Sequence, residues 1–200
     1  MKYQNTKEKI LLKSFDYFSN NGYAGASIRQ IARSVGIRES AVYNHYKSKE
    51  EIFSAILSRF KLKSISKEIL SDDLLDQITN PDLFLKDFTL RLIEHWNKPD
   101  ERKFIRLLLM EQFTKIGSRV LSVSDYLDEL RSICKMLFSE MMKSGLIKKA
   151  DVDTITDEFV VPLFFLRTEK MNTDDDKNIN AVKHYAVKHA EYFWTAVRVV

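Results

Sequence analysis

The sequence predicts an all-helical (all-α) protein. Apolar residues recur every three or four positions along most of the 200 residues, which is the period of an amphipathic helix, and no stretch forms a convincing strand. Only 5 glycines and 3 prolines interrupt this pattern, and both residue types disfavour helix interiors. A hydrophobic fraction of 44%, with 12% aromatic residues, excludes a disordered chain. The length fits one domain, or a small domain joined to a larger one.

The first expected helix covers residues 6–21. Thr6 can cap its N-terminus, and Gly22 follows its last turn. A short second helix begins at Ser27 and ends before Gly36, because glycine accepts the left-handed conformation that stops a helix and turns the chain.

Further helices are expected along the rest of the chain. One runs from about Glu39 to Tyr46, and the next begins at Ser48, where Glu51 completes the pattern of a capping box. Pro162 should kink or restart the helix that contains it. Beyond residue 63 the expected helices cover 81–96, 105–116, 124–144, 153–170 and 179–198, with a polar, acidic loop at 171–178.

Positive charge is concentrated in the N-terminal third of the sequence. Residues 1–63 hold 12 Lys and Arg against 5 Asp and Glu, a net charge of +7, whereas the remainder holds 20 against 23, a net charge of −3. A basic module on a slightly acidic body is typical of a nucleic-acid-binding protein. A solvated helical surface would give the same skew, so charge alone does not decide the function.

The second and third expected helices form a helix-turn-helix, because a glycine-containing turn joins them and the first helix braces them. The later helix of the pair must be slim enough to enter the major groove of DNA, which is about 12 Å wide. Its first turn carries the small residues Ser40 and Ala41, where bases would lie close. Residues that could reach phosphates follow: Tyr43, Asn44, His45, Lys47 and Lys49.

The stretch from Ser27 to Phe53, SIRQIARSVGIRESAVYNHYKSKEEIF, resembles the DNA-binding signature of the TetR family of transcriptional regulators. The matching features are an Ile-Ala pair in the second helix, the Gly-Ile turn and the closing Val-Tyr-x-His-Tyr-Lys-x-Lys-Glu. The resemblance implies a three-helix helix-turn-helix DNA-binding domain at 1–50 and a larger helical domain at 51–200. The second domain would bind a small effector and dimerise through its last two helices.

The resemblance also implies roles for individual residues. Arg29 would reach DNA from the second helix, and a bidentate contact with guanine would suit it. Tyr43 and Lys49 would bind phosphates, while His45 would either contact the DNA backbone or brace its helix. The full set of expected DNA-binding residues is Arg29, Arg38, Glu39, Ser40, Ala41, Tyr43, Asn44, His45, Lys47 and Lys49.

Two positions depart from the family pattern. Arg38 stands where the family commonly has a Ser or Thr cap, so the third helix loses a side-chain acceptor that stabilises by roughly 1 kcal/mol. The Arg38 guanidinium becomes a candidate DNA contact instead. Glu39 would oppose DNA unless it accepts a hydrogen bond from a cytosine amine or pairs with Arg38. The operator sequence therefore cannot be carried over from a relative.

The helices at 153–170 and 179–198 are apolar on more than one face, which favours burial against a second copy of the chain. A larger monomeric core is the alternative. The expected interface residues are Phe159, Leu163, Leu166, Val182, Tyr185, Phe193 and Val197. The body also supplies aromatic and Met side chains that suit an apolar or aromatic effector better than a highly charged one. The expected pocket residues are Trp96, Phe104, Met110, Phe113, Tyr126, Phe138 and Phe165.

The sequence predicts no catalytic site, no metal site and no cofactor. His184 and His189 are five residues apart, which does not place them on one helix face, and no cluster of ligands accompanies them. Cys134, the single cysteine, falls on an apolar stripe and is expected to pack as a small hydrophobe. The longest uncharged run, 17–28, is short and largely polar, and the N-terminus lacks a secretory signal. With a lone cysteine, these features predict a cytoplasmic protein.

We therefore expect a homodimeric repressor that binds a palindromic DNA operator and releases it when a small molecule binds. The helix that begins at Ser48 would couple the two events through a change in its tilt. Two alternatives remain open at this point. One is a DNA-binding protein of this fold that binds no ligand and is recruited by a protein partner. The other is a helical enzyme or adaptor whose basic end is incidental.

Overall fold

The computed structural model describes residues 5–61, 65–170 and 179–199. These residues form helices and one two-stranded hairpin, so the all-helical expectation is confirmed in its main part. The chain divides into two compact units. The first consists of Met1–Lys63 and Lys103–Val123, and the second of Ser64–Arg102 and Ser124–Val200. The expected domain boundary between residues 50 and 51 stays a prediction.

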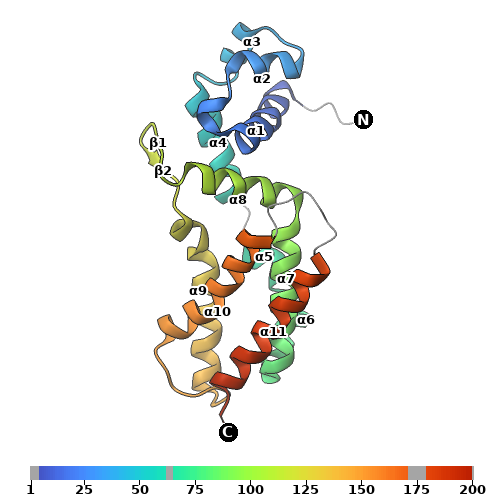
Figure 1. Cartoon of the computed structure of the whole chain (residues 1–200), viewed down its shortest axis with the longest axis vertical. Coiled ribbons are helices and arrows are strands. Elements are labelled where there is room, and N and C mark those ends of the chain that lie inside the picture. Colours follow the sequence, from blue (N-terminus) through green and yellow to red (C-terminus); the bar gives the residue numbers. More distant parts are fainter. Residues whose placement is uncertain (1–4, 62–64, 171–178, 200) are drawn as a thin grey trace. The chain divides into compact units, whose positions relative to one another are not determined.

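The first unit contains the helices expected from the sequence. They are α1 (Thr6–Gly25), α2 (Ile28–Val35), α3 (Glu39–Tyr43) and α4 (Lys49–Lys61). α1 packs against α2 and α4, and α2 packs against α3 (Figure 1). Each helix contributes a fully buried apolar side chain, and burial of such side chains stabilises the unit; these are Phe18, Ile31, Val42 and Phe53.

The backbone leaves the helical conformation within α1 at Gly22, as the sequence predicts. Gly22 has φ +73° and ψ 169°, a combination essentially restricted to glycine. The carboxylate of Glu111 lies against this position and accepts a hydrogen bond from the Tyr23 N–H at 2.7 Å. A Cβ at Gly22 would lie 2.9 Å from Glu111 Oε1. The backbone conformation therefore requires glycine here, and a Cβ would also force the Glu111 carboxylate to move.

Glu111 ends α8 (Pro99–Glu111), whose later residues belong to the first unit. Lys103 Nζ pairs with Asp16 of α1 at 2.6 Å, and Arg106 donates to the Asn20 side chain at 3.0 Å. These contacts and the Glu111 contact hold α8 along α1.

A hairpin follows α8, where the apolar stripe of the sequence predicts helix up to residue 116 and no strand. β1 (Lys115–Ile116) pairs antiparallel with β2 (Arg119–Val120) across a two-residue loop. Gly117, at the first loop position, has φ +61°, which suits the tight turns of two-residue hairpins. The expectation of helix at this position is therefore wrong, because a turn-forming Gly-Ser pair interrupts the apolar stripe.

In its described residues, the second unit is built around four long helices and one pair of short ones. α7 (Pro81–Asn97) packs against α11 (Ile179–Val197), and α11 also packs against α10 (Val152–Lys170). Pro81 occupies the first turn of α7, as expected. The short helices α5 (Ile65–Ile69) and α6 (Asp72–Leu75) pack against α7, and a 3-10 turn, η1 (Asp76–Thr79), leads into it. These short elements carry too few residues to show a helical period, so the sequence does not predict them.

An aromatic cluster forms the core of the second unit. The ring of Phe159 on α10 lies 4.9 Å from that of Phe193 on α11 and 5.6 Å from that of Phe138 on α9 (Val123–Lys143), measured between ring centres. α10 is one helix through Pro162, so the helix does not restart there. The expected loop at 171–178 lies outside the described residues. Among the described helices, none is both long enough and apolar enough to cross a bilayer.

Candidate nucleic-acid interface

A capping box between Ser27 and Gln30 begins α2. The Ser27 hydroxyl accepts a hydrogen bond from the Gln30 N–H at 3.2 Å, and the Gln30 side-chain oxygen accepts one from the Ser27 N–H at 2.9 Å. This reciprocal capping box fixes where the helix begins. Arg29, in the first turn, is consequently held on the outside of the unit, where it is exposed.

The turn between α2 and α3 depends on Gly36. Its φ of +77° and ψ of 29° are left-handed, and the N–H of Ile37 donates back to the Ala32 carbonyl at 3.0 Å. This geometry closes the C-terminus of α2 and redirects the chain. Arg38 then starts α3 without any side-chain cap, as its residue type predicts.

α3 is shorter than the sequence indicates, because its helical conformation ends at Tyr43 rather than at Tyr46. Val42 within the helix and Tyr46 beyond it are buried and fix the inner side of the element. The Tyr46 hydroxyl donates to the Lys7 carbonyl of α1 at 3.3 Å. The outer side of α3 is thereby left free of contacts with the rest of the unit's core.

Most of the expected DNA-binding residues lie on this outer side. Within the described part of the chain, neither Arg29 nor Arg38 nor Lys47 forms an ion pair, and the alternative pairing of Glu39 with Arg38 does not occur. Three cationic side chains are therefore available to an external anion. The exposed residues are Arg29, Arg38, Glu39, Ser40, Tyr43, Asn44 and Lys47, and the half-buried ones are Ala41, His45 and Lys49.

Lys49, at the start of α4, is engaged inside the unit. Its Nζ donates to the carbonyls of Tyr23 and Ala26, each at 2.9 Å, and lies 4.2 Å from the centre of the Tyr23 ring. Desolvation on burial lowers the pKa of Lys49 from its ordinary value. Any phosphate contact would compete with these two carbonyls, so the structure adds a bracing role that the sequence did not indicate.

The turn before α4 differs in one detail from the expected capping box. Ser48 Oγ accepts from the Glu51 N–H at 3.2 Å, but the Glu51 carboxylate accepts from the Lys47 N–H rather than from that of Ser48. The carboxylate still satisfies an amide at the helix N-terminus, where a negative charge is favoured.

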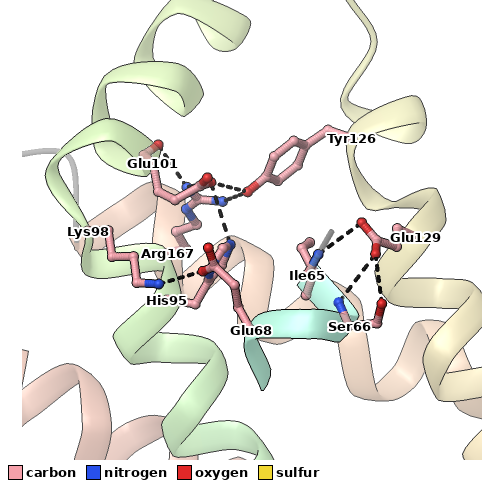
Figure 2. Close-up of polar contacts among 9 residues, drawn as sticks. All are labelled: Ile65, Ser66, Glu68, His95, Lys98, Glu101, Tyr126, Glu129 and Arg167. Carbon is pink, nitrogen blue, oxygen red and sulfur yellow. Dashed lines mark hydrogen bonds and ion pairs between the residues drawn. The ribbon is translucent and has the colours of Figure 1, made fainter. Parts of the chain in front are cut away.

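A separate polar site lies inside the second unit, and we call it the Arg167 cluster: Glu68, His95, Lys98, Glu101, Tyr126 and Arg167 (Figure 2). Arg167 of α10 is fully buried. Its guanidinium donates to the Tyr126 hydroxyl and to the backbone carbonyl of Glu101, the latter at 3.0 Å. The Glu101 carboxylate accepts from the Tyr126 hydroxyl at 3.1 Å. Burial raises the pKa of Tyr126 to about 12.

His95 and Lys98 form the outer part of the cluster. His95 Nδ1 lies 2.6 Å from Glu68 Oε2, and Lys98 Nζ donates to the same oxygen. These contacts, with Lys98 the stronger, hold the pKa of Glu68 below its usual range. Figure 2 also shows Glu129 accepting from the amides of Ile65 and Ser66, at 3.1 Å and 3.3 Å, at the start of α5.

No sequence signal identified the Arg167 cluster, because its members come from separate elements. The helical period places Arg167 on the buried side of α10, four residues after Leu163, but an arginine near a helix end is usually assumed to reach solvent. Only the packing of α10 against its neighbours encloses it.

The expected pocket residues are dispersed. Tyr126 belongs to the Arg167 cluster and Trp96 adjoins it, since the guanidinium carbon lies 5.0 Å from the centre of the Trp96 ring and 5.2 Å from that of Tyr126. Phe138 is part of the aromatic core. Phe104 is buried, but it belongs to the first unit, as do Met110 and Phe113, which are 40% and 92% exposed. Phe165, on α10, is 65% exposed. Within the second unit, the structure therefore brings together Trp96 and Tyr126 and places Phe138 in the aromatic core.

The expected dimer residues also divide into two groups. Phe159, Leu163, Val182 and Phe193 are buried within the protomer's own core, and Leu166 and Val197 are half-buried. Only Tyr185, at 55%, is mainly exposed. The exposed apolar side chains of α10 and α11 lie on the opposite faces: Val161, Phe165, Tyr185 and Tyr192. Both faces are apolar in sequence, so the period alone could not say which one the protomer buries.

Comparison with known proteins identifies the helix-turn-helix. Residues 10–56 match the family profile of the bacterial regulatory proteins, tetR family. The solved structure of AibR in complex with isovaleryl coenzyme A and operator DNA shares the fold over 92% of this chain and 96% of that one, with a TM-score of 0.64 and 17% identity. Residues 10–56 therefore form a helix-turn-helix of the TetR family of transcriptional regulators. This is a family of regulators and not of enzymes.

Two transcriptional regulators of the HTH type resemble the sequence directly. BepR, an HTH-type transcriptional repressor from Brucella suis, is 27% identical over 138 residues, which cover 69% of this chain and 65% of BepR. IcaR, a negative transcriptional regulator of the biofilm operon icaADBC from Staphylococcus epidermidis, is 40% identical over 47 residues, covering 24% of this chain and 25% of IcaR. The matches thus span less than two thirds of either relative's length, and the stronger identity is confined to the DNA-binding region.

Proposed function

We propose that this TetR-family regulator is a cytoplasmic repressor that binds a palindromic DNA operator as a homodimer. The observation that carries the proposal is the outer side of α2 and α3, where Arg29, Arg38 and Lys47 are exposed and have no ion-pair partner among the described residues. Cations without a partner next to a slim helix suit phosphates and base edges. BepR and IcaR are repressors, and AibR has been solved with operator DNA, which supports the same assignment.

The exposed apolar faces of α10 and α11 support the homodimer. Val161 and Phe165 are four residues apart on α10, and Tyr185 and Tyr192 are seven apart on α11, so each pair follows one helical stripe. Adjacent helices with such stripes can pair with their own copies across a two-fold axis. A dimer would present two recognition helices to two half-sites of one operator.

We further propose that a small molecule bound in the second unit controls operator affinity. Support comes from the Arg167 cluster, which is polar and buried, and from AibR, which has been solved with an acyl coenzyme A. α8 contributes Glu101 to this cluster, and its later residues Lys103 and Glu111 contact α1 and the residue that follows Gly22. One continuous helix therefore carries residues of both units, and with α4 it is a route by which ligand could bias two states of different DNA affinity.

Footprinting on genomic fragments tests the assignment as a DNA-binding regulator. The wild-type chain should protect two half-sites related by two-fold symmetry. Arg29→Ala and Tyr43→Ala should each abolish specific protection without changing the oligomeric state, because both side chains are exposed at the interface and outside the core. Arg131→Ala is the matched control, since Arg131 pairs with Asp157 in the second unit and should leave protection unchanged.

The outcomes separate the alternatives. An adaptor or enzyme with an incidental basic end would protect no half-site. A regulator recruited by a protein partner would protect half-sites, but no small molecule would change its affinity. Unchanged operator affinity in Arg29→Ala or Tyr43→Ala would remove that residue from the interface.

A further inference from the structure

Three buried nitrogen atoms in and beside the Arg167 cluster have no hydrogen-bond partner among the described residues: Arg167 Nε, Trp96 Nε1 and His95 Nε2. Arg167 and Trp96 are both 0% exposed, and their nitrogens are donors in every protonation state found in proteins. Buried donors are nearly always paired, and each exception needs an explanation such as a bound water or ligand. Unpaired donors gathered beside one guanidinium indicate an acceptor that the chain does not supply.

The charge of Arg167 is also loosely compensated. Its ion-pair partner among the described residues is Glu101, whose Oε2 lies 3.7 Å from Arg167 Nη2, beyond hydrogen-bond distance. The two hydrogen bonds that the guanidinium does form go to uncharged oxygens, the Tyr126 hydroxyl and the Glu101 backbone carbonyl. Buried arginines are normally stabilised by direct, often bidentate, contacts with an anion. The arrangement therefore leaves the Arg167 Nε–H without an acceptor and the guanidinium without a direct hydrogen bond to a negative group.

We propose that the Arg167 cluster binds the carboxylate of an organic acid, and that this acid is the effector of the regulator. The guanidinium carbon lies 5.0 Å from the centre of the Trp96 ring, so the two donors without a partner, Arg167 Nε–H and Trp96 Nε1–H, belong to neighbouring side chains. Phe164 lies 6.4 Å from Trp96 and 6.3 Å from Tyr126 between ring centres, which gives the body of the acid an aromatic surface. The inference rests on the proposed control by a small molecule and names its chemical class.

A singly charged head group fits better than a doubly charged one. The carboxylates of Glu101 and Glu68 already lie on the two sides of His95, at 3.8 Å from Nε2 and 2.6 Å from Nδ1. A phosphate monoester would bring a second negative charge next to them, and like charges in a buried site repel strongly. A monocarboxylate supplies one negative charge and two acceptor atoms, which match the two unpaired donors.

Fluorescence of the full-length Trp194→Phe variant tests the proposal, because Trp96 is then the only tryptophan. The probes are the straight-chain acids from acetate to dodecanoate, with benzoate and phenylacetate, each compared with its primary amide. We expect at least one acid to change the Trp96 emission and raise the melting temperature. Its amide should bind about 10- to 100-fold more weakly, because a hydrogen bond to a charged group is lost.

Variants at Arg167 assign the effect to this residue. Arg167→Met should abolish the preference for acid over amide, whereas Arg167→Lys, which keeps the cation, should retain part of it. Arg131→Met, which removes an arginine paired with Asp157 elsewhere in the unit, should leave the preference intact. If Arg167→Met does not fold by circular dichroism, Trp96→Phe keeps an aromatic ring and removes one donor. That variant should weaken acid binding by about 10-fold in thermal-shift titrations.

Other outcomes would contradict acid binding, the effector role or operator binding, each separately. Equal affinity for acid and amide, or no response to any member of the series, would mean that the unpaired donors hold ordered water only. Acid binding without any change in operator affinity would overturn the effector role. Operator binding itself is measured on the ligand-free protein by footprinting, so its failure would count against the proposed function independently of the acid titrations.

Discussion

Gly22 and Gly36 both have positive φ, but only Gly22 lies against another side chain. Gly36 is left-handed, and a Cβ there would meet nothing within 4 Å, whereas Gly22 has an extended ψ and a Cβ there would lie 2.9 Å from Glu111 Oε1. Gly36→Ala should therefore lower the free energy of unfolding by about 1 kcal/mol, and Gly22→Ala by about 3 kcal/mol or more. Urea unfolding followed by circular dichroism measures both. Equal losses would contradict a requirement for space at Gly22.

Lys47 and Lys49 are neighbouring cations with different surroundings. Lys47 is exposed, whereas the Lys49 ammonium donates to two carbonyls. Lys47→Ala should leave the melting temperature unchanged and reduce the slope of log affinity against log salt by about one unit on any DNA sequence. Lys49→Ala should lower stability by about 1 kcal/mol, because two hydrogen bonds in a partly exposed place are lost. A Lys49→Ala protein of unchanged stability would show that the two carbonyl contacts contribute nothing.

Local chemistry made several residues predictable from sequence. Ser27 and Gly36 act through their own backbone neighbours, so the cap and the turn follow from residue type and spacing. The same holds for Arg38, which forms no cap because it has no side-chain acceptor. Lys49 and Arg167 could not be assigned in this way, because their partners lie 23 or more residues away in the chain.

At the scale of the elements, His189 links α11 to α10. Its Nε2 lies 3.0 Å from the Phe159 carbonyl, and its ring stacks on the Phe159 ring with centres 5.8 Å apart. Burial lowers the pKa of His189 below its ordinary value of 6.5. The neutral folded form resists protonation while the unfolded chain takes up a proton, so this contribution is present above the unfolded pKa and is lost as the pH falls below it.

The free energy of unfolding should therefore decrease as the pH is lowered from about 7 through the ordinary histidine range. In His189→Gln, the part of this decrease that comes from His189 should disappear. His184→Gln changes an exposed histidine on the same helix and should leave the decrease in place. Denaturant unfolding over this pH range gives the comparison, and identical curves for the wild type and His189→Gln would rule out His189 as the source.

The hairpin between α8 and α9 shows why the type of a short element can be predicted wrongly from sequence. The apolar stripe of α8 continues in sequence to Ile116, but the Gly117-Ser118 pair forms a two-residue turn and the chain pairs with itself instead. The prediction extended the apolar period of α8 beyond the end of that helix and gave too little weight to the Gly117-Ser118 pair, which forms the turn. The long helices were predictable because many residues repeat one pattern, and the four-residue elements α6 and η1 were not.

At the scale of the whole molecule, the exposed stripe of α10 and α11 is the part expected to pair with a second copy. Phe165→Glu combined with Tyr192→Glu places charges where side chains are 65% and 76% exposed in the protomer, and desolvating them in an interface is unfavourable. We expect the mass from light scattering to fall to that of a monomer, with loss of two-half-site footprints. Met136→Glu, at a residue 58% exposed on α9, is the control and should remain dimeric. If the double variant remains a dimer, the interface lies outside this stripe of α10 and α11.

The helical class, the position of the helix-turn-helix and the residues that cap and turn it could all be predicted from the amino-acid sequence. These features depend on contacts between residues a few positions apart, and such contacts leave a spacing pattern in the chain. The packing of the folded chain was needed to show which face of α10 and α11 is buried, that Lys49 binds carbonyls, and that Arg167 lies in a polar cluster with unpaired donors. Each of these features depends on which distant segments pack together. The apolar period of a helix shows which of its faces is apolar, but it does not show which segment packs against that face.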